Sequence, residues 1–380
     1  MLQLPVYLDY NATTPCDPQV LEAMLPWFTT RFGNAASKTH RYGWEADEAI
    51  SIAREQVAQL LKADASEIVF TSGATEAINL AIQAVFHTYT NKGKHIITWQ
   101  TEHKAVLDTC AALEKQGADI SYLPVNSNGR PDLDLLNQSI RPDTILIAGM
   151  FANNETGVLF PIRSIGAMAK EKQVLFFCDA TQAVGKVPVD VQADGIDLLA
   201  LSAHKIYGPK GVGALYVRRR NPRVKLTPLI YGGGHEKGLR SGTLNVPGIV
   251  GLGKACALAG GLMQTESGRL TTVRNQLLDG LLQTGSCTLS GSRSFLLPHV
   301  ANLSFTIPGA NQLIARLNQQ LALSSGSACS SALAEPSHVL KAMGINDEAA
   351  GGSIRFSLGR FTTEEEVAFA LETIKKILSE

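Results

Sequence analysis

The chain has 380 residues, of which 45% are hydrophobic and 18% charged, so it can bury a substantial core and is not intrinsically disordered. Its 34 Lys and Arg residues balance its 34 Asp and Glu residues, which argues against a polybasic nucleic-acid binder and against an acidic solvating chain. Six cysteines are thinly spread, without a CxxC pair or zinc-type spacing, so we expect neither an intrinsic metal site nor a disulfide scaffold.

The N-terminus and the apolar stretches predict a cytoplasmic protein without a membrane segment. The first ten residues lack the basic region and the long apolar run of a secretory signal. The longest uncharged stretch, residues 295–315, contains two prolines and a histidine, so it cannot span a bilayer.

Short β-branched runs alternate with longer helical patterns over residues 66–220. This alternation predicts an α/β fold with a mostly parallel sheet covered by helices on both faces. An amphipathic helix is expected over residues 44–62. The expected strands are 68–72, 95–99, 119–125, 144–150, 174–180, 197–202 and 212–217.

After residue 220 the pattern changes and predicts a smaller C-terminal α+β domain. A helix is expected around 255–285, and loops are expected near 306–311 and 324–332. The last helix has capping-box spacing at Thr362 and Glu365.

Polar residues follow five of the predicted strands. Because ligands bind beyond the carboxyl ends of strands in such sheets, we expect these residues to form one site. They are Thr71, Ser72, Gly73, Ala74 and Thr75, then Glu102 and His103, then Asn153, Asn154 and Glu155, then Asp179 and Gln182, and finally Ser202, His204 and Lys205.

Three of these features together match what pyridoxal phosphate needs. Small residues at a helix start offer free N–H groups to a phosphate. Lys205 can form a Schiff base, and Asp179 can pair with the pyridine nitrogen and keep the ring an electron sink. No other lysine is expected at this edge of the sheet. Taken singly, the three features would be a helix cap, a surface lysine and a turn residue.

Residues 324–332 are a run of small residues around Cys329. The simple interpretation is a flexible linker with an incidental thiol. Sulfur transfer, however, needs a thiol on a mobile arm that reaches a cofactor and then an external acceptor. Among the other cysteines, Cys110, Cys178 and Cys256 are expected to be inert core thiols, and Cys16 and Cys287 give no functional signal.

Over essentially its whole length, the sequence closely resembles the cysteine desulfurases, which are fold-type I pyridoxal-phosphate enzymes of the class V aminotransferase group. The segment SSGSAC is typical of group I, the IscS/NifS-like branch. The motifs that carry the resemblance are YLDYNATTP (7–15), FGNAAS (32–37), TSGATEA (71–77), TEHKAVL (101–107), NNETG (153–157), CDATQ (178–182), SAHKIYGPKG (202–211), GGGHEKGLRSGT (232–243), SSGSACSSA (324–332) and SIRFSLGRFTTEEE (353–366).

The resemblance implies that the chain converts L-cysteine to L-alanine and holds the sulfur as a persulfide on Cys329. The sulfur would pass to acceptors for iron–sulfur cluster assembly, tRNA thiolation or other thio-cofactor pathways. The resemblance also implies a role for each site residue. At the ring of the cofactor, Lys205 forms the covalent bond, His103 stacks and moves protons, Asp179 pairs with the nitrogen and Gln182 bonds the hydroxyl. The phosphate is held by Ala74, Thr75, Ser202 and His204, and Thr243 reaches the phosphate in the other subunit of a homodimer; Asn154 and Arg355 position the cofactor and the substrate carboxylate.

The resemblance also implies a domain division and partners. A large domain with a seven-stranded sheet would span residues 16–262, and residues 1–15 and 263–380 would form the small domain. Expected partners are an iron–sulfur scaffold protein or other sulfur acceptors, with no direct nucleic-acid binding. Cys329 is also a candidate ligand for a transferred iron–sulfur cluster. A docking patch for an acidic frataxin-like regulator is expected at Arg218, Arg219, Arg220, Arg223 and Lys225.

Two departures from the family pattern bear on these expectations. Ala203 stands where many relatives have glycine, and a methyl group is expected to be tolerated there. The chain ends at Glu380, whereas well-known bacterial members of the housekeeping branch continue with a tail that helps to dock the scaffold protein. Docking through such a tail is therefore not expected.

Two alternatives stay open at this point. The first is another enzyme on the same cofactor, an aminotransferase or a selenocysteine lyase, but plain transamination does not need the segment around Cys329. The second is a binding module that keeps the fold without catalysis, against which four intact residues argue: Lys205, Asp179, His103 and Cys329.

Overall fold

The computed structural model describes residues 2–325 and 336–379. Its centre is a seven-stranded sheet in the order β2-β8-β7-β6-β5-β3-β4. Neighbouring strands are parallel except where β8 pairs with β2 and β7, so the predicted mostly parallel α/β sheet is confirmed. The strands are β2 (Ile68–Thr71), β3 (His95–Trp99), β4 (Asp119–Leu123), β5 (Thr144–Met150), β6 (Leu175–Asp179), β7 (Leu198–Ser202) and β8 (Gly213–Val217).

Helices cover both faces of this sheet, which explains the continuous apolar runs of its strands. Consecutive residues such as Phe176 and Phe177 are fully buried in two different core clusters, because side chains alternate across a strand. One face carries α3 (Arg41–Leu61), α6 (Leu133–Ser139), α7 (Ile162–Glu171) and the first half of α8 (Val246–Leu282), and the other carries α4 (Ala74–Tyr89) and α5 (Lys104–Glu114).

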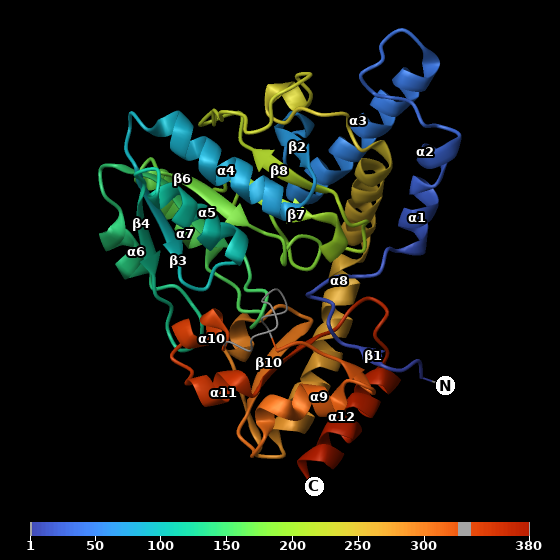
Figure 1. Cartoon of the computed structure of the whole chain (residues 1–380), viewed down its shortest axis with the longest axis vertical. Helices are drawn as coiled ribbons and strands as arrows, with labels where there is room; N and C mark the ends of the chain where they lie inside the picture. The colour runs from blue at the N-terminus through green and yellow to red at the C-terminus, as the bar shows by residue number, and fades with distance from the viewer. Residues whose placement is uncertain (1, 326–335, 380) are drawn as a thin grey trace.

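The helix expected around 255–285 is longer than predicted and begins at Val246, after the N-cap Asn245. Its first turns contain glycines that read as a loop in the sequence. A Cβ on Gly253 would lie 2.6 Å from the Cα of Ala53 in α3, so glycine is what lets the two helices pack closely. Figure 1 shows α8 running from beside α3 down to α12.

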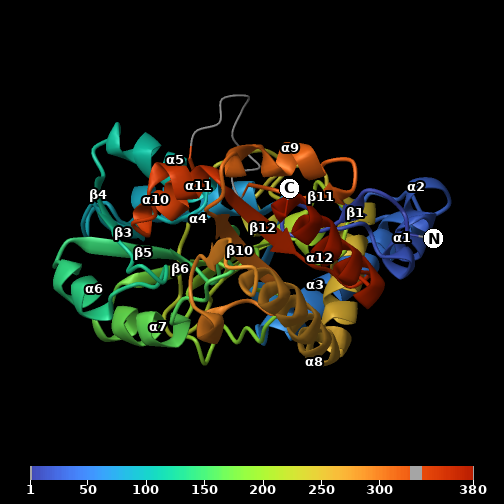
Figure 2. The ribbon, with the colours of Figure 1, turned by 90° about the horizontal axis from the view of Figure 1, so that it is seen from below.

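A second, smaller sheet lies at the other end of α8, where Figure 2 shows β10 and β12 close to α12. Its order is β12-β10-β9, and both pairings are antiparallel. The bounds are β9 (Cys287–Leu289), β10 (Val300–Phe305), β12 (Ser353–Ser357) and α12 (Glu364–Leu378). The capping box of α12 is formed by Thr363 and Glu366, one residue later than predicted, because Thr362 instead accepts a hydrogen bond from Gly359 N.

The N-terminal strand joins this second region. β1 (Val6–Tyr7) pairs in parallel with β11 (Leu321–Ala322), and Val6 and Leu8 lie in the same core cluster as the second half of α8. Helix α8 itself runs without a break through residue 262, so the division of the chain at residues 16 and 262 stays a prediction. The remaining helices are α1 (Pro18–Met24), α2 (Pro26–Thr29), α9 (Leu313–Leu317), α10 (His338–Ala342) and α11 (Asp347–Gly351).

Within the described residues, α8 is the one helix whose length and apolar composition would suffice to cross a membrane. Half of its most apolar window is buried inside the protein, and it packs against α1, α3 and α12. These contacts are those of a core helix.

Candidate active site

The N-terminus of α4 lies at the end of β2 and has no side-chain cap. Gly73 is its N-cap and supplies no side chain, so no side-chain cap satisfies the N–H groups of the first turn, which includes Ala74 and Thr75. The hydroxyl oxygen of Ser202 lies 3.9 Å from where a Cβ on Gly73 would be, so this buried side chain faces the same turn. A phosphate group fits this arrangement.

His204 follows β7 beside this turn, as predicted. Its Nδ1 lies 3.1 Å from the hydroxyl of Thr13. Burial, together with the nearby charge of Lys205, lowers the pKa of His204 to about 4, so the ring is neutral at neutral pH. A neutral imidazole can still donate one hydrogen bond to a phosphate.

Two buried carboxyl groups lie at the carboxyl ends of β6 and β3. Asp179 Oδ1 accepts hydrogen bonds from the N–H and the hydroxyl of Thr181, at 3.0 and 2.5 Å. Glu102 Oε1 accepts from Met150 N at 2.8 Å, while its Oε2 has no partner in the described part of the chain. Burial raises the pKa of Glu102 well above its usual range, and the nearby Asp179 adds to the shift. This shift favours the neutral form of Glu102, and Asp179, held by Thr181, is placed to pair with a pyridinium nitrogen.

Lys205 lies at the centre of the site, where its amine donates to the backbone oxygens of Asn11 and Ala12. Asn11 is buried, and its side chain also links Asn154 to His299. Its Nδ2 donates to the backbone oxygen of Asn154 at 2.9 Å, and its Oδ1 accepts from His299 Nε2 at 2.9 Å. The sequence analysis assigned no role to Asn11, although it lies inside the YLDYNATTP motif.

Arg355, the predicted ligand of the substrate carboxylate, is 2% exposed and lies in β12. Its Nη2 is 2.6 Å from Asp9 Oδ1, and its Nη1 donates to the backbone oxygen of Asn154 at 3.0 Å. Its Nε has no partner in residues 2–325 and 336–379. A buried guanidinium N–H without a partner is suited to an incoming carboxylate.

His103 is the N-cap of α5. Its Nδ1 accepts from Ala105 N at 3.0 Å, so in the neutral ring the proton is on Nε2.

Through the neighbouring Glu155, the site also contacts the chain that follows residue 335. Ser337 donates a hydrogen bond from its hydroxyl to Glu155 Oε2. Burial raises the pKa of Glu155, against the opposing effect of that hydrogen bond.

The predicted nucleophile Cys329 lies outside the described residues, but both flanks of its segment end at the site. The backbone oxygen of Ser324 accepts from Arg355 N at 2.7 Å, and His338 Nε2 lies 3.0 Å from the backbone oxygen of Glu102. The chain therefore leaves and re-enters the described structure beside residues of the site.

The buried cysteines behave as predicted for core thiols. Burial raises the pKa of Cys110 and of Cys256 to about 12, and it raises that of Cys178 well above the usual range. Cys287 is also buried, with a pKa raised to about 11, while Cys16 is partly exposed. Thiolate chemistry at neutral pH is therefore not expected at Cys110, Cys178, Cys256 or Cys287.

Two sequence predictions need correction. Arg218 is 7% exposed and forms an ion pair of 3.0 Å with Asp197, so it is not part of a solvent-facing basic patch. The expectation that Lys205 would be the sole lysine at this edge of the sheet is also wrong. Lys186 and Lys205 together line a small cavity there.

Thr243 is exposed on the loop after Arg240, which forms an ion pair of 2.7 Å with Glu76 in the first turn of α4. A contact between Thr243 and the other subunit of a homodimer stays a prediction. Gln182 does join the Lys205 site, because its Nε2 donates to the same backbone oxygen of Asn11.

These residues fit pyridoxal phosphate. The uncapped start of α4 suits its phosphate, Asp179 suits the ring nitrogen, and the amine of Lys205 suits the aldehyde. The amine of Lys205 donates to the backbone oxygens of Asn11 and Ala12, so the segment after β1 is part of the site.

Comparisons with known proteins agree with this chemistry. Residues 6–369 match the family model for class V aminotransferases. The chain is 54% identical to the cysteine desulfurase IscS of Anaeromyxobacter dehalogenans, with 99% of this chain and 94% of that protein covered. It is 52% identical to the cysteine desulfurase IscS of Shewanella sediminis, with 100% and 94% covered.

Solved structures show the same fold. A NifS-like protein superposes with a TM-score of 0.91 at 38% identity, over 99% of this chain and all of that one. SspA in complex with cysteine superposes with a TM-score of 0.82, also at 38% identity, over 94% of this chain and 99% of that one. The chain therefore belongs to the class V aminotransferase family, and within it to the pyridoxal-phosphate-dependent cysteine desulfurases.

Proposed function

We propose that the chain converts L-cysteine to L-alanine and keeps the sulfur as a persulfide on Cys329. One observation carries this proposal. The residues suited to the cofactor (Lys205, Asp179 and the uncapped start of α4) share a site with Arg355 and Glu102, which contact the two flanks of the Cys329 segment at Ser324 and His338. The solved complex of SspA with cysteine supports cysteine as the substrate.

The residues of the chain have separate tasks in this reaction. Bound pyridoxal phosphate supplies an electron sink for the charge that remains when the α-proton of cysteine is removed. Lys205 Nζ takes that proton, and Asp179 stabilises the positive charge on the ring nitrogen. Arg355 Nε holds the substrate carboxylate, since this buried donor has no partner among the described residues.

The sulfur step balances at Cys329. Its thiolate attacks the sulfur of the substrate, a new S–S bond forms and the C–S bond breaks. The electron pair of the broken bond stays with the β-carbon, which takes up a proton and becomes the methyl group of alanine. His103 carries a proton on Nε2 when neutral and assists proton transfer at this stage. The products are alanine and the Cys329 persulfide.

For its setting, we propose a cytoplasmic homodimer that passes sulfur to an iron–sulfur scaffold protein or another acceptor. Of the five predicted basic residues, Arg218 is buried and four remain for docking an acidic frataxin-like regulator: Arg219, which is half-buried, and Arg220, Arg223 and Lys225, which are exposed. A positive patch of this kind speeds the encounter with an acidic surface.

The experiment that tests the proposed reaction measures alanine released from L-cysteine by the cofactor-loaded protein. Wild type should release alanine in many turnovers when a reductant removes the persulfide sulfur. Lys205→Ala should release none. An aminotransferase would instead need a keto-acid co-substrate and would convert cysteine to the corresponding 2-keto acid. Release of that keto acid in place of alanine would contradict the proposal.

A further inference from the structure

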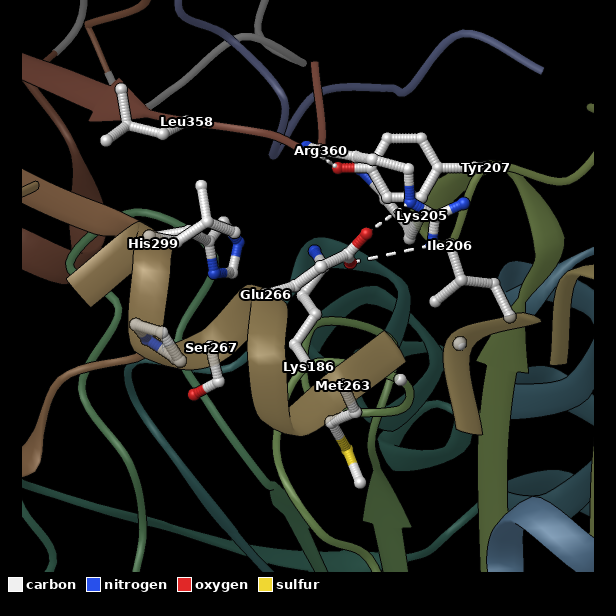
Figure 3. Close-up of a pocket in the computed structure, with 14 residues that line it drawn as sticks. Lys186, Lys205, Ile206, Tyr207, Met263, Glu266, Ser267, His299, Leu358 and Arg360 are labelled. Carbon is white, nitrogen blue, oxygen red and sulfur yellow. Dashed lines mark hydrogen bonds and ion pairs between the residues drawn. The ribbon is translucent and has the colours of Figure 1, made fainter. Parts of the chain in front are cut away.

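A second lysine lies behind the candidate active site. Lys186 follows Gly185 in the turn after β6 and is partly buried. It lines a cavity of about 20 Å³ together with Lys205 and His299, below α8. Figure 3 shows these three side chains around the cavity, with the Glu266–Arg360 ion pair beside them.

The contact that matters joins Lys186 to Gln182. The Lys186 amine donates to Gln182 Oε1 at 3.2 Å, and Gln182 Nε2 donates to the backbone oxygen of Asn11 at 3.1 Å. In its ammonium form the Lys186 nitrogen has donors and no acceptor, so that form determines which end of the amide faces it. The oxygen of Gln182 must point to Lys186, and the NH2 group must point toward the backbone oxygen that Lys205 also contacts.

This orientation has a chemical consequence at the cofactor. The ring hydroxyl oxygen of pyridoxal phosphate, when ionised, is an acceptor and needs a donor. A Gln182 side chain turned the other way would present its carbonyl oxygen and repel that group. Lys186 does not need to touch the cofactor to decide between the two orientations.

The charges around Lys186 favour a second effect. Burial lowers the pKa of Lys186 to about 7, and the positive charges of Lys205 and Arg355 add to this shift. The other titratable groups that face it do not offset this charge. The pKa of His299 is lowered well below its usual range and that of His204 to about 4, and Glu266 is paired with Arg360 at 2.5 Å.

Coulomb repulsion is mutual, so the charge that Lys186 carries below its pKa of about 7 disfavours a proton on the nitrogen of Lys205 as much as the reverse. A Lys205 nitrogen that gives up its proton more readily is the form that reacts with an aldehyde and takes up an α-proton.

We propose that Lys186 is a positioning residue, which holds the Gln182 amide with its NH2 group toward the ring hydroxyl of the cofactor and places a positive charge behind Lys205. This inference rests on the cofactor site assigned above and deepens it. It concerns a residue for which the sequence analysis proposed no role.

The test compares Lys186→Met, Lys186→Arg, Gln182→Ala and the double variant Lys186→Met/Gln182→Ala. The first readout is the dissociation constant of pyridoxal phosphate, measured by titration of the apoprotein. Loss of one oriented hydrogen bond should weaken binding about threefold to tenfold in Lys186→Met. The same change in the Gln182→Ala background should weaken binding clearly less, because the contact through Gln182 is gone and only the through-space effect of the Lys186 charge on Lys205 remains. Lys186→Arg keeps a donor and a charge and should restore most of the affinity.

The second readout is the pH midpoint at which the visible absorption of the bound cofactor changes, since this reports protonation of the nitrogen supplied by Lys205. The midpoint should rise in Lys186→Met, both alone and in the Gln182→Ala background, because the charge acts through space. A merely structural role would lower the melting temperature and leave both readouts unchanged.

Equal effects of Lys186→Met on cofactor affinity with and without Gln182 would overturn the positioning role, and an unchanged pH midpoint would overturn the electrostatic one. If Lys186→Met failed to fold, the cofactor affinity of the double variant Lys186→Arg/Gln182→Ala would be compared with that of Gln182→Ala. Equal affinities are expected, and unequal affinities would count against the proposal. Alanine release by the wild type reports the proposed function separately, so the two failures are distinguishable.

Discussion

The buried guanidinium of Arg355 and the partly exposed carboxylate of Asp9 form an ion pair of 2.6 Å that joins β12 to the segment after β1. The same arginine holds the backbone oxygen of Asn154 and keeps its Nε without a partner among the described residues. The group expected to bind the substrate carboxylate is thus held in place before substrate arrives.

We predict that Asp9→Ala destabilises the protein by about 3 kcal/mol, because it leaves the buried charge of Arg355 unpaired. The measurement is the free energy of unfolding in urea. As a matched control, exposed Asp47 pairs with Lys38, and Asp47→Ala should cost less than about 1 kcal/mol. Equal costs for the two variants would contradict the importance of the Asp9 pair.

Arg355→Lys should raise KM for L-cysteine at least about tenfold and leave cofactor binding nearly unchanged. Lysine keeps the charge but lacks the Nε donor and the planar geometry that binds carboxylates. Steady-state alanine production measures KM, and the visible spectrum measures cofactor binding. An unchanged KM would show that the substrate carboxylate binds elsewhere.

Glu102 provides a prediction about pH. Burial raises its pKa in the folded state, so its favourable contribution to stability is complete below the unfolded pKa of about 4.3 and is lost as the pH rises toward the folded value. Glu102→Gln keeps the acceptor for Met150 N and removes this loss. The variant should therefore gain stability relative to wild type as the pH rises from 5 to 8, measured as the difference in melting temperature. A difference that stays constant or shrinks over this range would contradict the neutral state of Glu102.

Lys205 and Lys186 line one cavity, so the covalent attachment point of the cofactor can be tested against its neighbour. After reduction with borohydride, peptide mass spectrometry should find the cofactor on Lys205. Lys205→Ala should lose both the yellow colour and alanine release, since the Lys186 amine is engaged with Gln182. Cofactor trapped on Lys186 in the wild type would refute the assignment.

The basic residues after β8 should divide into two classes. Charge reversal at Arg220 and Arg223, which are exposed, should weaken binding of an acidic frataxin-like protein, and added salt should weaken the wild-type complex. Arg218→Ala should instead lower the melting temperature, because Arg218 is bound to Asp197 and to the backbone oxygen of Ile196. If charge reversal at both Arg220 and Arg223 left the affinity for the acidic protein unchanged, this surface would not be its docking site.

The central sheet could be predicted because most of its strands, such as β5 and β7, are short apolar runs bounded by loops, and burial on both faces requires such runs. The start of α8 could not, since Gly248, Gly251 and Gly253 resemble a loop until the fold shows Gly251 packed against Met24 of α1 and Gly253 against Ala53 of α3. The buried state of Arg218 was missed for a similar reason: a run of arginines reads as solvated, while its partner Asp197 lies on another strand end.

The candidate site shows the same limit. Lys205, Asp179 and Gln182 were predictable from their places at strand ends and from the resemblance. Asn11 was not, because its contacts with Asn154 and His299 join segments far apart in the chain. Lys186 was not predictable either, since only the folded turn after β6 brings it to Gln182.

The central claim is that Cys329 receives the sulfur, and one measurement tests it most directly. The cofactor-loaded protein is treated with L-cysteine, digested without reductant and analysed by mass spectrometry, with Cys329→Ser as the matched variant. The account predicts an added mass of one sulfur atom on the peptide that contains Cys329, and no alanine from Cys329→Ser, which should keep its cofactor colour because Lys205 and Asp179 are unchanged. An adduct on Cys110 or Cys178, or alanine still formed by Cys329→Ser, would contradict it.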